Sequence, residues 1–285
     1  MLLKDYRNHF INILTPLYDA EEADRFFIIT LEALKGWRRI DLVLNPDALV
    51  TDEELVQWDA VLQQLQTHRP IQYIFGTAYF YGLDFTVNGD TLIPRPETEE
   101  LVDWVIAENA GRPLKLIDIG TGSGCIAISL AKNLPKAQVS AMDISEGALA
   151  VAIGNATDNN VSVNFIQQDV LALNALPETY DIIVSNPPYV RELEKHEIKP
   201  NVLDFEPHLA LFVTDSDPLL FYRKIAQLAK SGLNAGGRLY FEINQYLGPG
   251  TVAMLQEEGF DEVVLRKDMY GNDRMVGCKI SEFRV

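Results

Sequence analysis

The chain has 285 residues, 47% of them hydrophobic, and a formal net charge of -17 at pH 7. That length is enough for one large domain or two modest ones, each with its own hydrophobic core. So negative a chain repels nucleic acid at long range unless a basic patch overrides the field, and the densest basic stretch, at residues 35–39, is no such patch.

The cysteines and the N-terminal residues bear on the cellular compartment. Cys125 and Cys278 lie far apart in the sequence, which favours a reduced, cytoplasmic protein over a disulfide scaffold. Charges at Lys4, Asp5 and Arg7 interrupt the apolar N-terminus, and no long apolar run follows. We therefore expect neither a signal peptide nor a membrane-spanning segment.

Residues 1–76 have the sequence pattern of a small helical bundle. Asp19 can cap a helix that ends at Gly36, and Thr51 with Glu54 forms a capping box for a later helix. Apolar residues then recur at helical spacing, at Leu55, Trp58, Leu62 and Leu65. We predict a separate helical domain, which either docks a partner or serves as a structural cap on the rest of the chain.

The hydrophobic period changes after residue 76. Residues 78–81 and 84–87 flank Gly82 and predict a β-hairpin, the main part of a linker over residues 77–94. The next segment, Pro94-Arg95-Pro96-Glu97-Thr98, is stiffened by its prolines, and Thr98 can cap the helix that follows. This segment is either a plain connection or a rigid lid over a cofactor, with Arg95 and Glu97 available for polar contacts.

Beyond residue 114 strand and helix patterns alternate, with helical stretches expected between the first five strands. The last two strands are joined by too few residues for a helix, so they should form an antiparallel hairpin. The pattern predicts a mostly parallel, doubly wound, seven-stranded sheet in a catalytic domain over residues 95–285. The predicted strands are 115–119, 138–143, 162–167, 180–185, 238–243, 261–267 and 274–280.

A glycine loop ends the first of these strands and consists of Gly120, Thr121, Gly122, Ser123 and Gly124. Its glycines allow a tight turn and a close approach of the backbone to a ligand. Asp143 ends the second strand, where its carboxylate can accept hydrogen bonds from both hydroxyls of a ribose. A dinucleotide-binding fold has a similar loop and acid. The glycine spacing differs here, however, and the acidic surroundings suit a sulfonium cofactor better than two phosphates, which favours S-adenosylmethionine over NAD.

Asp169 and Val170 follow the third strand and have two possible roles. Asp169 can meet the amino group of an adenine, with Val170 against the ring, or it can simply cap a helix that begins at Val170. Cys125 follows the glycine loop without a base or metal partner, so we expect a small packed residue there rather than a nucleophile.

The fourth strand ends in Asn186-Pro187-Pro188-Tyr189. Proline cannot continue the hydrogen-bond ladder, so this segment leaves the sheet extended and stiff, at the edge where open α/β sheets bind ligands. The Asn186 side-chain oxygen and the Pro187 carbonyl can each accept one N–H of a planar NH₂ group, and Tyr189 can pack on its face. The motif predicts methylation of such a nitrogen; a plain strand-terminating turn is the alternative.

His196 and His208 lack a nucleophile to pair with, and no His, Cys and carboxylate cluster has metal-ligand spacing. We therefore expect no metal site.

Taken together, these motifs resemble the protein-(glutamine-N5) methyltransferases that act on peptide chain release factors. The resemblance runs nearly the whole chain, and residues 94–98 are its most discriminating part because other methyltransferases with the Asn-Pro-Pro-Tyr motif lack them. The segments that carry it are 70–76, 92–99, 118–124, Asp143, 186–189, 206–207, 222–223 and 241–243.

The resemblance implies a class I, Rossmann-like S-adenosylmethionine-dependent methyltransferase domain, preceded by a helical domain that helps to hold the release factor. The methyl acceptor would be the glutamine of the factor's Gly-Gly-Gln loop, presented to Asn186, Pro187, Pro188 and Tyr189. S-adenosylmethionine would be bound by the glycine loop, Asp143 and Asp169, with S-adenosylhomocysteine as the product.

This chain departs from the family's usual pattern at three places. It has no glycine at residues 213–219, Asn244 stands where a glycine is usual, and Val170 stands where an aromatic residue is common. These departures bear on the adenine pocket and nearby loops and leave the acceptor motif intact.

Two other functions use the same features. An N6-adenine methyltransferase of DNA or RNA would apply the same chemistry to an exocyclic amine, but the charge of -17 and the lack of a basic target-reading domain disfavour it. A non-enzymatic S-adenosylmethionine sensor is disfavoured by the intact acceptor motif. We therefore predict a cytoplasmic, monomeric methyltransferase that supports translation termination, with no stable nucleic-acid partner and no membrane association.

Overall fold

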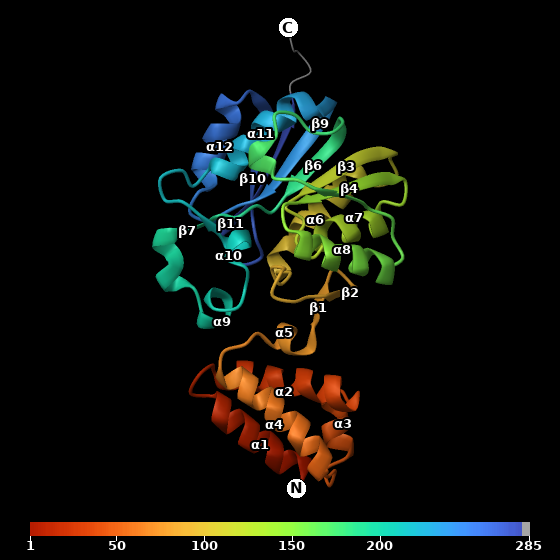
Figure 1. Cartoon of the computed structure of the whole chain (residues 1–285), viewed down its shortest axis with the longest axis vertical. Helices are drawn as coiled ribbons and strands as arrows, with labels where there is room; N and C mark the ends of the chain where they lie inside the picture. Colours follow the sequence, from red (N-terminus) through yellow and green to blue (C-terminus); the bar gives the residue numbers. More distant parts are fainter. Residues whose placement is uncertain (281–285) are drawn as a thin grey trace. The chain divides into compact units, whose positions relative to one another are not determined.

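The computed structural model describes residues 1–280, which form two compact units. The first, which we call the helical unit, comprises Met1–Gly76 together with Pro200–Phe205. The second, the sheet unit, comprises the rest of the described chain. Figure 1 colours both units along the sequence.

The helical unit contains the helices that the sequence predicts. The Asp19 carboxylate accepts a hydrogen bond from the Glu22 amide at 2.7 Å, and Gly36 ends the same helix with a left-handed φ of 65°. The capping box of Thr51 and Glu54 is also present. The core of the helical unit centres on large apolar side chains such as Phe27 and Trp58. The helices are α1 Leu3–Leu14, α2 Ala20–Lys35, α3 Arg39–Leu44, α4 Asp52–Gln66, α5 Ile71–Phe75 and, from the later segment, α9 Pro200–Leu203.

The sheet unit is built on a seven-stranded sheet with the strand order β10-β11-β9-β6-β3-β4-β5. All neighbouring strands pair in parallel except β11, which is antiparallel to β10 and to β9. This confirms the mostly parallel sheet with a terminal hairpin that the sequence predicts. The strands are β3 Leu114–Ile119, β4 Ala137–Asp143, β5 Asn164–Gln167, β6 Tyr180–Ser185, β9 Leu233–Glu242, β10 Phe260–Lys267 and β11 Asp273–Ile280.

Helices cover both faces of this sheet because its buried strands are apolar on both sides. In β3, Leu116 packs in the core beneath α6 and α7, whereas its neighbour Ile117 packs in the core beneath α11 and α12. The same alternation recurs in the other central strands. Figure 1 shows these two helical layers on opposite sides of the strands. The helices are α6 Pro96–Asn109, α7 Cys125–Asn133, α8 Glu146–Asp158, α11 Leu220–Gly232 and α12 Gly248–Glu257.

Shorter elements lie around this framework. A hairpin of β1 Thr77–Phe80 and β2 Leu83–Thr86 precedes α6, as the sequence predicts. A buried asparagine of α8, Asn155, accepts from the Thr86 amide and donates to the carbonyls of Thr86 and Ser123. The remaining short elements are η1 Val170–Ala172, β7 Val190–Arg191, η2 Glu192–Glu197, α10 His208–Leu211 and β8 Phe212–Val213.

Three local predictions were wrong. The crossover between β5 and β6 has only the 3-10 turn η1 instead of a helix, and the chain reaches Pro177 soon after it. Strand β9 begins at Leu233, five residues earlier than expected, because the glycine-containing start still pairs with Tyr180 across an irregularity in register. Helix α6 begins at Pro96, which suits the first helical position, so Thr98 lies inside the helix and is not its cap.

Among residues 1–280 we find no helix with both the length and the apolar character that a bilayer crossing requires.

Candidate active site

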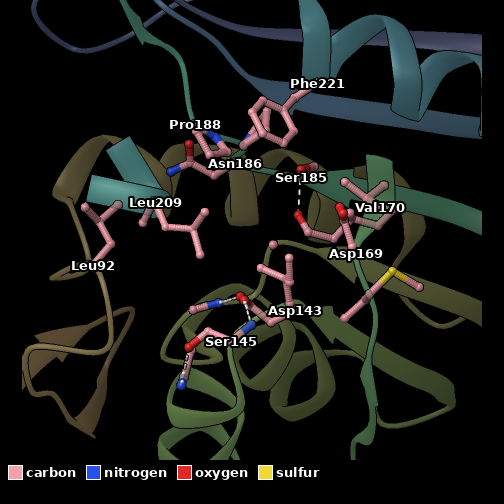
Figure 2. Close-up of a pocket in the computed structure, with 18 of the residues that line it drawn as sticks. Leu92, Asp143, Ser145, Asp169, Val170, Ser185, Asn186, Pro188, Leu209 and Phe221 are labelled. Atoms are coloured by element: carbon pink, nitrogen blue, oxygen red, sulfur yellow. Dashed lines mark hydrogen bonds between the residues drawn. The ribbon is translucent and has the colours of Figure 1, made fainter. Parts of the chain in front are cut away.

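A cavity of about 360 Å³ opens at the carboxyl ends of the central strands. It lies where β3 pairs with β4 on one side and β6 on the other, which is where the strand order reverses and where open α/β sheets bind ligands. Figure 2 shows Asn186 at one end, Asp143 at the opposite end, and Leu92 and Asp169 on facing sides. We call these the acceptor end, at Asn186, and the cofactor end, at Asp143.

At the cofactor end the Asp143 carboxylate is held by backbone amides. Its Oδ2 accepts from the Gly122 amide at 2.8 Å, and its Oδ1 accepts from the Ser145 amide at 3.0 Å (Figure 2). Each oxygen keeps a further lone pair, because a carboxylate oxygen can accept two hydrogen bonds. Asp143 can therefore still accept hydrogen bonds from a ligand in the cavity.

The glycine loop brings the backbone close to the cavity. Gly120 and Gly122 line the cavity, with φ of 77° and 55° that L-residues with side chains rarely adopt. Gly124 also has a positive φ, and a Cβ there would lie 2.8 Å from the Ile128 side chain. Thr121, Ser123 and Gly124 are not among the residues that line the cavity, so they shape the loop from behind.

A buried carboxyl group stands directly before the loop. Asp118 is fully buried; its Oδ2 accepts from the Thr121 hydroxyl at 2.6 Å, and within the described residues its Oδ1 has no hydrogen-bond partner. Burial raises the pKa of Asp118 to about 7. Asp118 is not among the cavity-lining residues, so it supports the loop from behind.

Asp169, on the flank of the cavity, is placed for both of its expected roles, as a helix cap and as a neighbour of a ligand. Its Oδ1 accepts from the Leu171 amide at 2.8 Å, which caps η1 as the simpler alternative predicted. Asp169 and Val170 also line the cavity, so the other oxygen and the valine side chain lie beside any ligand there (Figure 2).

The acceptor end is formed by the residues that follow β6. Asn186, Pro187 and Pro188 line the cavity, and the Ser185 hydroxyl fixes the end of β6 by donating to the Ile119 carbonyl at 2.6 Å. Tyr189 is not a lining residue. Its ring packs against the core beneath α11 and α12.

Two buried residues stand behind the acceptor end. Glu242, at the end of β9, is 1% exposed and accepts hydrogen bonds from the hydroxyls of Thr98 at 2.5 Å and Tyr189 at 3.1 Å. The Thr98 hydroxyl in turn accepts from the side-chain amide of Asn186 at 3.5 Å. Burial raises the pKa of Glu242, an effect that these hydrogen bonds and the Arg274 charge oppose.

Sequence reasoning did not assign a role to Thr98 or Glu242 at this site. No short-range pattern pairs them, because 144 residues separate them in the chain. Two signals were available. Both residues lie in segments that carry the family resemblance, and Glu242 interrupts an otherwise apolar strand end, between the buried Phe241 and Ile243.

Two other expected site residues lie elsewhere. Arg95 pairs with the buried carboxylate of Glu206 at 2.6 Å, and Glu206 also accepts from the Ile93 amide at 3.2 Å. Neither Arg95 nor Glu97 is among the cavity-lining residues. The preceding segment lines the cavity instead, through Gly89, Asp90 and Leu92.

Further lining residues were missed by the sequence analysis. Asp90 lies against α8, since a Cβ on Gly147 would come within 3.0 Å of its carboxylate. Others include three apolar side chains from α10 and α11, which no sequence motif marks. They are Leu209, Phe221 and Ile225.

The remaining reactive residues play no part in the cavity. Burial raises the pKa of the Cys125 thiol to about 12, so it stays protonated at neutral pH, as expected of a packed residue. His196 is exposed and its ring contacts the Leu193 carbonyl. Within residues 1–280 no group of three His, Cys, Asp or Glu side chains could hold a metal ion.

Comparison with known proteins adds to this geometry. The family model described as PrmC N-terminal domain matches residues 8–76, and the one described as Methyltransferase small domain matches residues 99–204. A release factor glutamine methyltransferase of Flavobacterium psychrophilum is 56% identical over 280 residues, covering 97% of this chain and 98% of the relative. A release factor glutamine methyltransferase of Bacteroides thetaiotaomicron is 47% identical, covering 92% and 95%.

The fold is shared more widely. A solved methyltransferase structure from Pyrococcus furiosus has a TM-score of 0.53 and 17% sequence identity, covering 79% of this chain and 98% of that one. At so low an identity this likeness concerns the fold alone.

Proposed function

The chain belongs to the release factor glutamine methyltransferase family, and from that premise we propose which atoms react and which residues take part. The methyl group of S-adenosylmethionine is transferred to the side-chain nitrogen N5 of the glutamine in the Gly-Gly-Gln motif of peptide chain release factors. The methylated nitrogen becomes acidic and releases one proton to solvent, the product S-adenosylhomocysteine leaves, and the modified factor supports translation termination.

The residues on the cavity fit this cofactor. Asp143 offers its free lone pairs to the ribose hydroxyls, and Asp169 with Val170 borders the space for the adenine. Gly120 and Gly122 let the backbone approach the cofactor closely. Arg95 and Glu97 do not line the cavity, so we do not assign them to the cofactor.

S-adenosylmethionine, when bound, supplies an electrophilic methyl group on a positively charged sulfur. The glutamine amide is a poor nucleophile because its nitrogen lone pair is delocalised, so it needs orientation more than deprotonation. The Asn186 side-chain oxygen and the Pro187 carbonyl, at the acceptor end, each accept one N–H of that amide and aim its nitrogen. Alignment of this kind can supply several of the ~7–11 kcal/mol available from proximity and orientation.

The observation that carries this proposal is the position of Asn186, Pro187 and Pro188 on the same cavity as the glycine loop and Asp143. Tyr189 supports this segment from behind, through its packing in the core and its hydrogen bond to Glu242. We propose further that residues 1–76 form the release-factor-docking domain, that residues 77–94 form a linker and that residues 95–285 form the catalytic domain. The enzyme acts as a cytoplasmic monomer.

The test is transfer of a labelled methyl group from S-adenosylmethionine to purified release factor. The controls are a factor whose Gly-Gly-Gln glutamine is replaced by alanine, a short DNA duplex, and the Asn186→Ala enzyme. We expect label on the intact factor only, and none with the variant enzyme. Label on the DNA, or on the glutamine-free factor, would refute the substrate assignment while leaving the cofactor site standing.

A further inference from the structure

We propose that Glu242 is a positioning residue that acts through Thr98 to fix which way the side-chain amide of Asn186 faces. This inference rests on the proposed function, in which the Asn186 oxygen must face the acceptor. It concerns two side chains that lie outside the acceptor motif, one on α6 and one at the end of β9.

The contacts form a chain of three side chains. Asn186 Nδ2 donates to Thr98 Oγ1 at 3.5 Å, and Thr98 Oγ1 donates to Glu242 Oε2 at 2.5 Å. Thr98 is 2% exposed and Glu242 is 1% exposed, so water does not compete for these positions. We call Glu242, Thr98 and Asn186 the relay.

The polarity of the relay follows from what each group can donate. A carboxylate has no proton and can only accept, so the single proton of the Thr98 hydroxyl points to Glu242. The Thr98 oxygen then has only lone pairs to offer to Asn186. Asn186 must therefore turn its NH₂ group toward Thr98, which leaves Oδ1 free to accept a hydrogen bond from the acceptor amide.

A reversed amide would be inactive for a simple reason. Its NH₂ group would face the NH₂ group of the substrate, and two donors cannot form a hydrogen bond. The amide and the oxygen of an asparagine have nearly the same shape, so packing alone distinguishes them poorly. The relay distinguishes the two orientations of the Asn186 amide through the direction of its hydrogen bonds.

Glu242 also fixes a second residue of the acceptor motif. Its other oxygen, Oε1, accepts from the Tyr189 hydroxyl at 3.1 Å. Burial and the negative charge of Glu242 raise the pKa of Tyr189, so the phenol keeps its proton and remains a donor. One carboxylate thus holds both polar side chains of the motif in place.

The relay also has a consequence for specificity. With Oδ1 of Asn186 and the Pro187 carbonyl both facing the acceptor, the site presents two hydrogen-bond acceptors. A primary amide satisfies both with its two N–H groups, whereas a carboxylate would place oxygen against oxygen. The relay therefore selects glutamine over glutamate at the methylated position.

The decisive experiment compares two substitutions at one position. Thr98→Val keeps the shape of the side chain but removes the hydroxyl, and Thr98→Ser keeps the hydroxyl. We expect Thr98→Val to lower kcat for release factor methylation about 10- to 100-fold, and Thr98→Ser to restore most of it. The dissociation constant for S-adenosylmethionine, measured by calorimetry, should change less than about twofold in both. Equal losses in the two variants, or an unchanged kcat in Thr98→Val, would overturn the proposal.

A second variant tests the carboxylate itself. Thr98 and Tyr189 donate to different oxygens of Glu242, and in Glu242→Gln an NH₂ donor replaces one of these oxygens. One of the two hydroxyls then loses its acceptor, so kcat should again fall at least about 10-fold with cofactor affinity kept. Thr157→Val serves as the matched control, because Thr157 is exposed and its hydroxyl bonds only to the Ile153 carbonyl of its own helix. The control should leave kcat unchanged.

A spectroscopic readout separates this inference from the proposed function. The side-chain NH₂ signals of Asn186 can be assigned in a ¹⁵N-labelled protein by their loss in Asn186→Ala. They should shift in Thr98→Val and in Glu242→Gln but not in Thr157→Val. A wild-type enzyme that fails to label the release factor would refute the proposed function, whereas unshifted signals would refute the relay.

Discussion

The two ends of the cavity hold their central side chains by different means. At the cofactor end, backbone amides of Gly122 and Ser145, 21 and two residues away along the chain, hold Asp143. At the acceptor end, Asn186 depends on the side chain of Thr98, 88 residues away, which depends in turn on Glu242. Backbone support survives most substitutions of the residues that supply it, whereas side-chain support is lost with one substitution. The acceptor end should therefore be the more easily damaged by distant changes.

The largest effect should follow from Asn186→Ala. Loss of an oriented hydrogen-bonding group at a reacting centre costs on the order of 10²–10³ in kcat. Because Asp143 and the glycine loop are untouched, the affinity for S-adenosylmethionine should stay close to that of the wild type. Single-turnover methylation and calorimetry measure the two quantities. A parallel loss of cofactor affinity would show that the two ends are not independent.

The reciprocal change is Asp143→Ala. It removes charge-assisted hydrogen bonds to the cofactor, each contributing roughly 1.5–3 kcal/mol, so the dissociation constant for S-adenosylmethionine should rise about 10- to 100-fold. At saturating cofactor kcat should recover to within a few-fold of the wild type. A kcat that remained low at saturation would place Asp143 in the chemical step.

Lowering the pH should affect the acceptor end through Glu242. Because the pKa of Glu242 is raised, it takes up its proton at a higher pH than an exposed glutamate, whose pKa is about 4.3. The groups that face it are Thr98 and Glu97 on α6, Tyr189, and Arg274 on β11. Once protonated, Glu242 can donate to Thr98, the relay can reverse, and kcat should fall several-fold.

The sign of the accompanying stability change distinguishes this effect from unfolding. A carboxyl group whose pKa is raised by folding binds its proton more readily in the native state, so its contribution to stability grows as the pH falls through that pKa. Activity should therefore decline while the contribution of Glu242 to the free energy of unfolding increases. In Thr98→Val the residual kcat should no longer fall at low pH. If it still falls, a group other than Glu242 titrates.

The smallest effect concerns Asn244, where the family usually has glycine. Its Nδ2 donates to the Tyr189 carbonyl at 3.0 Å and to Glu194 at 2.9 Å, which ties the segment after Tyr189 to the end of β9. Glu194 keeps its hydrogen bonds from Arg191, so Asn244→Ala should cost about 0.5–1.5 kcal/mol of unfolding free energy, the net contribution of a typical hydrogen bond. Urea denaturation measures this, and kcat should change less than about threefold. A larger fall in kcat would extend the positioning role to Asn244.

The same contrast explains which features could be predicted. The caps at Asp19 and Thr51, and the glycine loop with Asp143, depend on residues near one another in the chain or on strand ends that a parallel sheet brings together. The Asn-Pro-Pro-Tyr segment could be placed at the sheet edge because proline must end a strand.

Thr98 and Glu242 could not be paired in advance, because their contact exists only in the folded sheet unit. Thr98 was expected as a helix cap. The local sequence fits a cap as well as it fits a residue inside the helix that bonds to Glu242. Pro96 takes the first helical position instead, which frees the Thr98 hydroxyl for a buried partner. The ion pair of Arg95 with Glu206 could not be predicted either, because 111 residues separate the two.

The three hydrogen bonds of Asn155 have a consequence for how the molecule opens. They join the last residue of the β1–β2 hairpin to the glycine loop through a single buried side chain on α8. Segments linked in this way lose their protection against amide hydrogen exchange in one cooperative step. The hairpin and the loop should therefore exchange at the same rate, and binding of the cofactor at the loop should slow exchange in a hairpin that the cofactor does not touch.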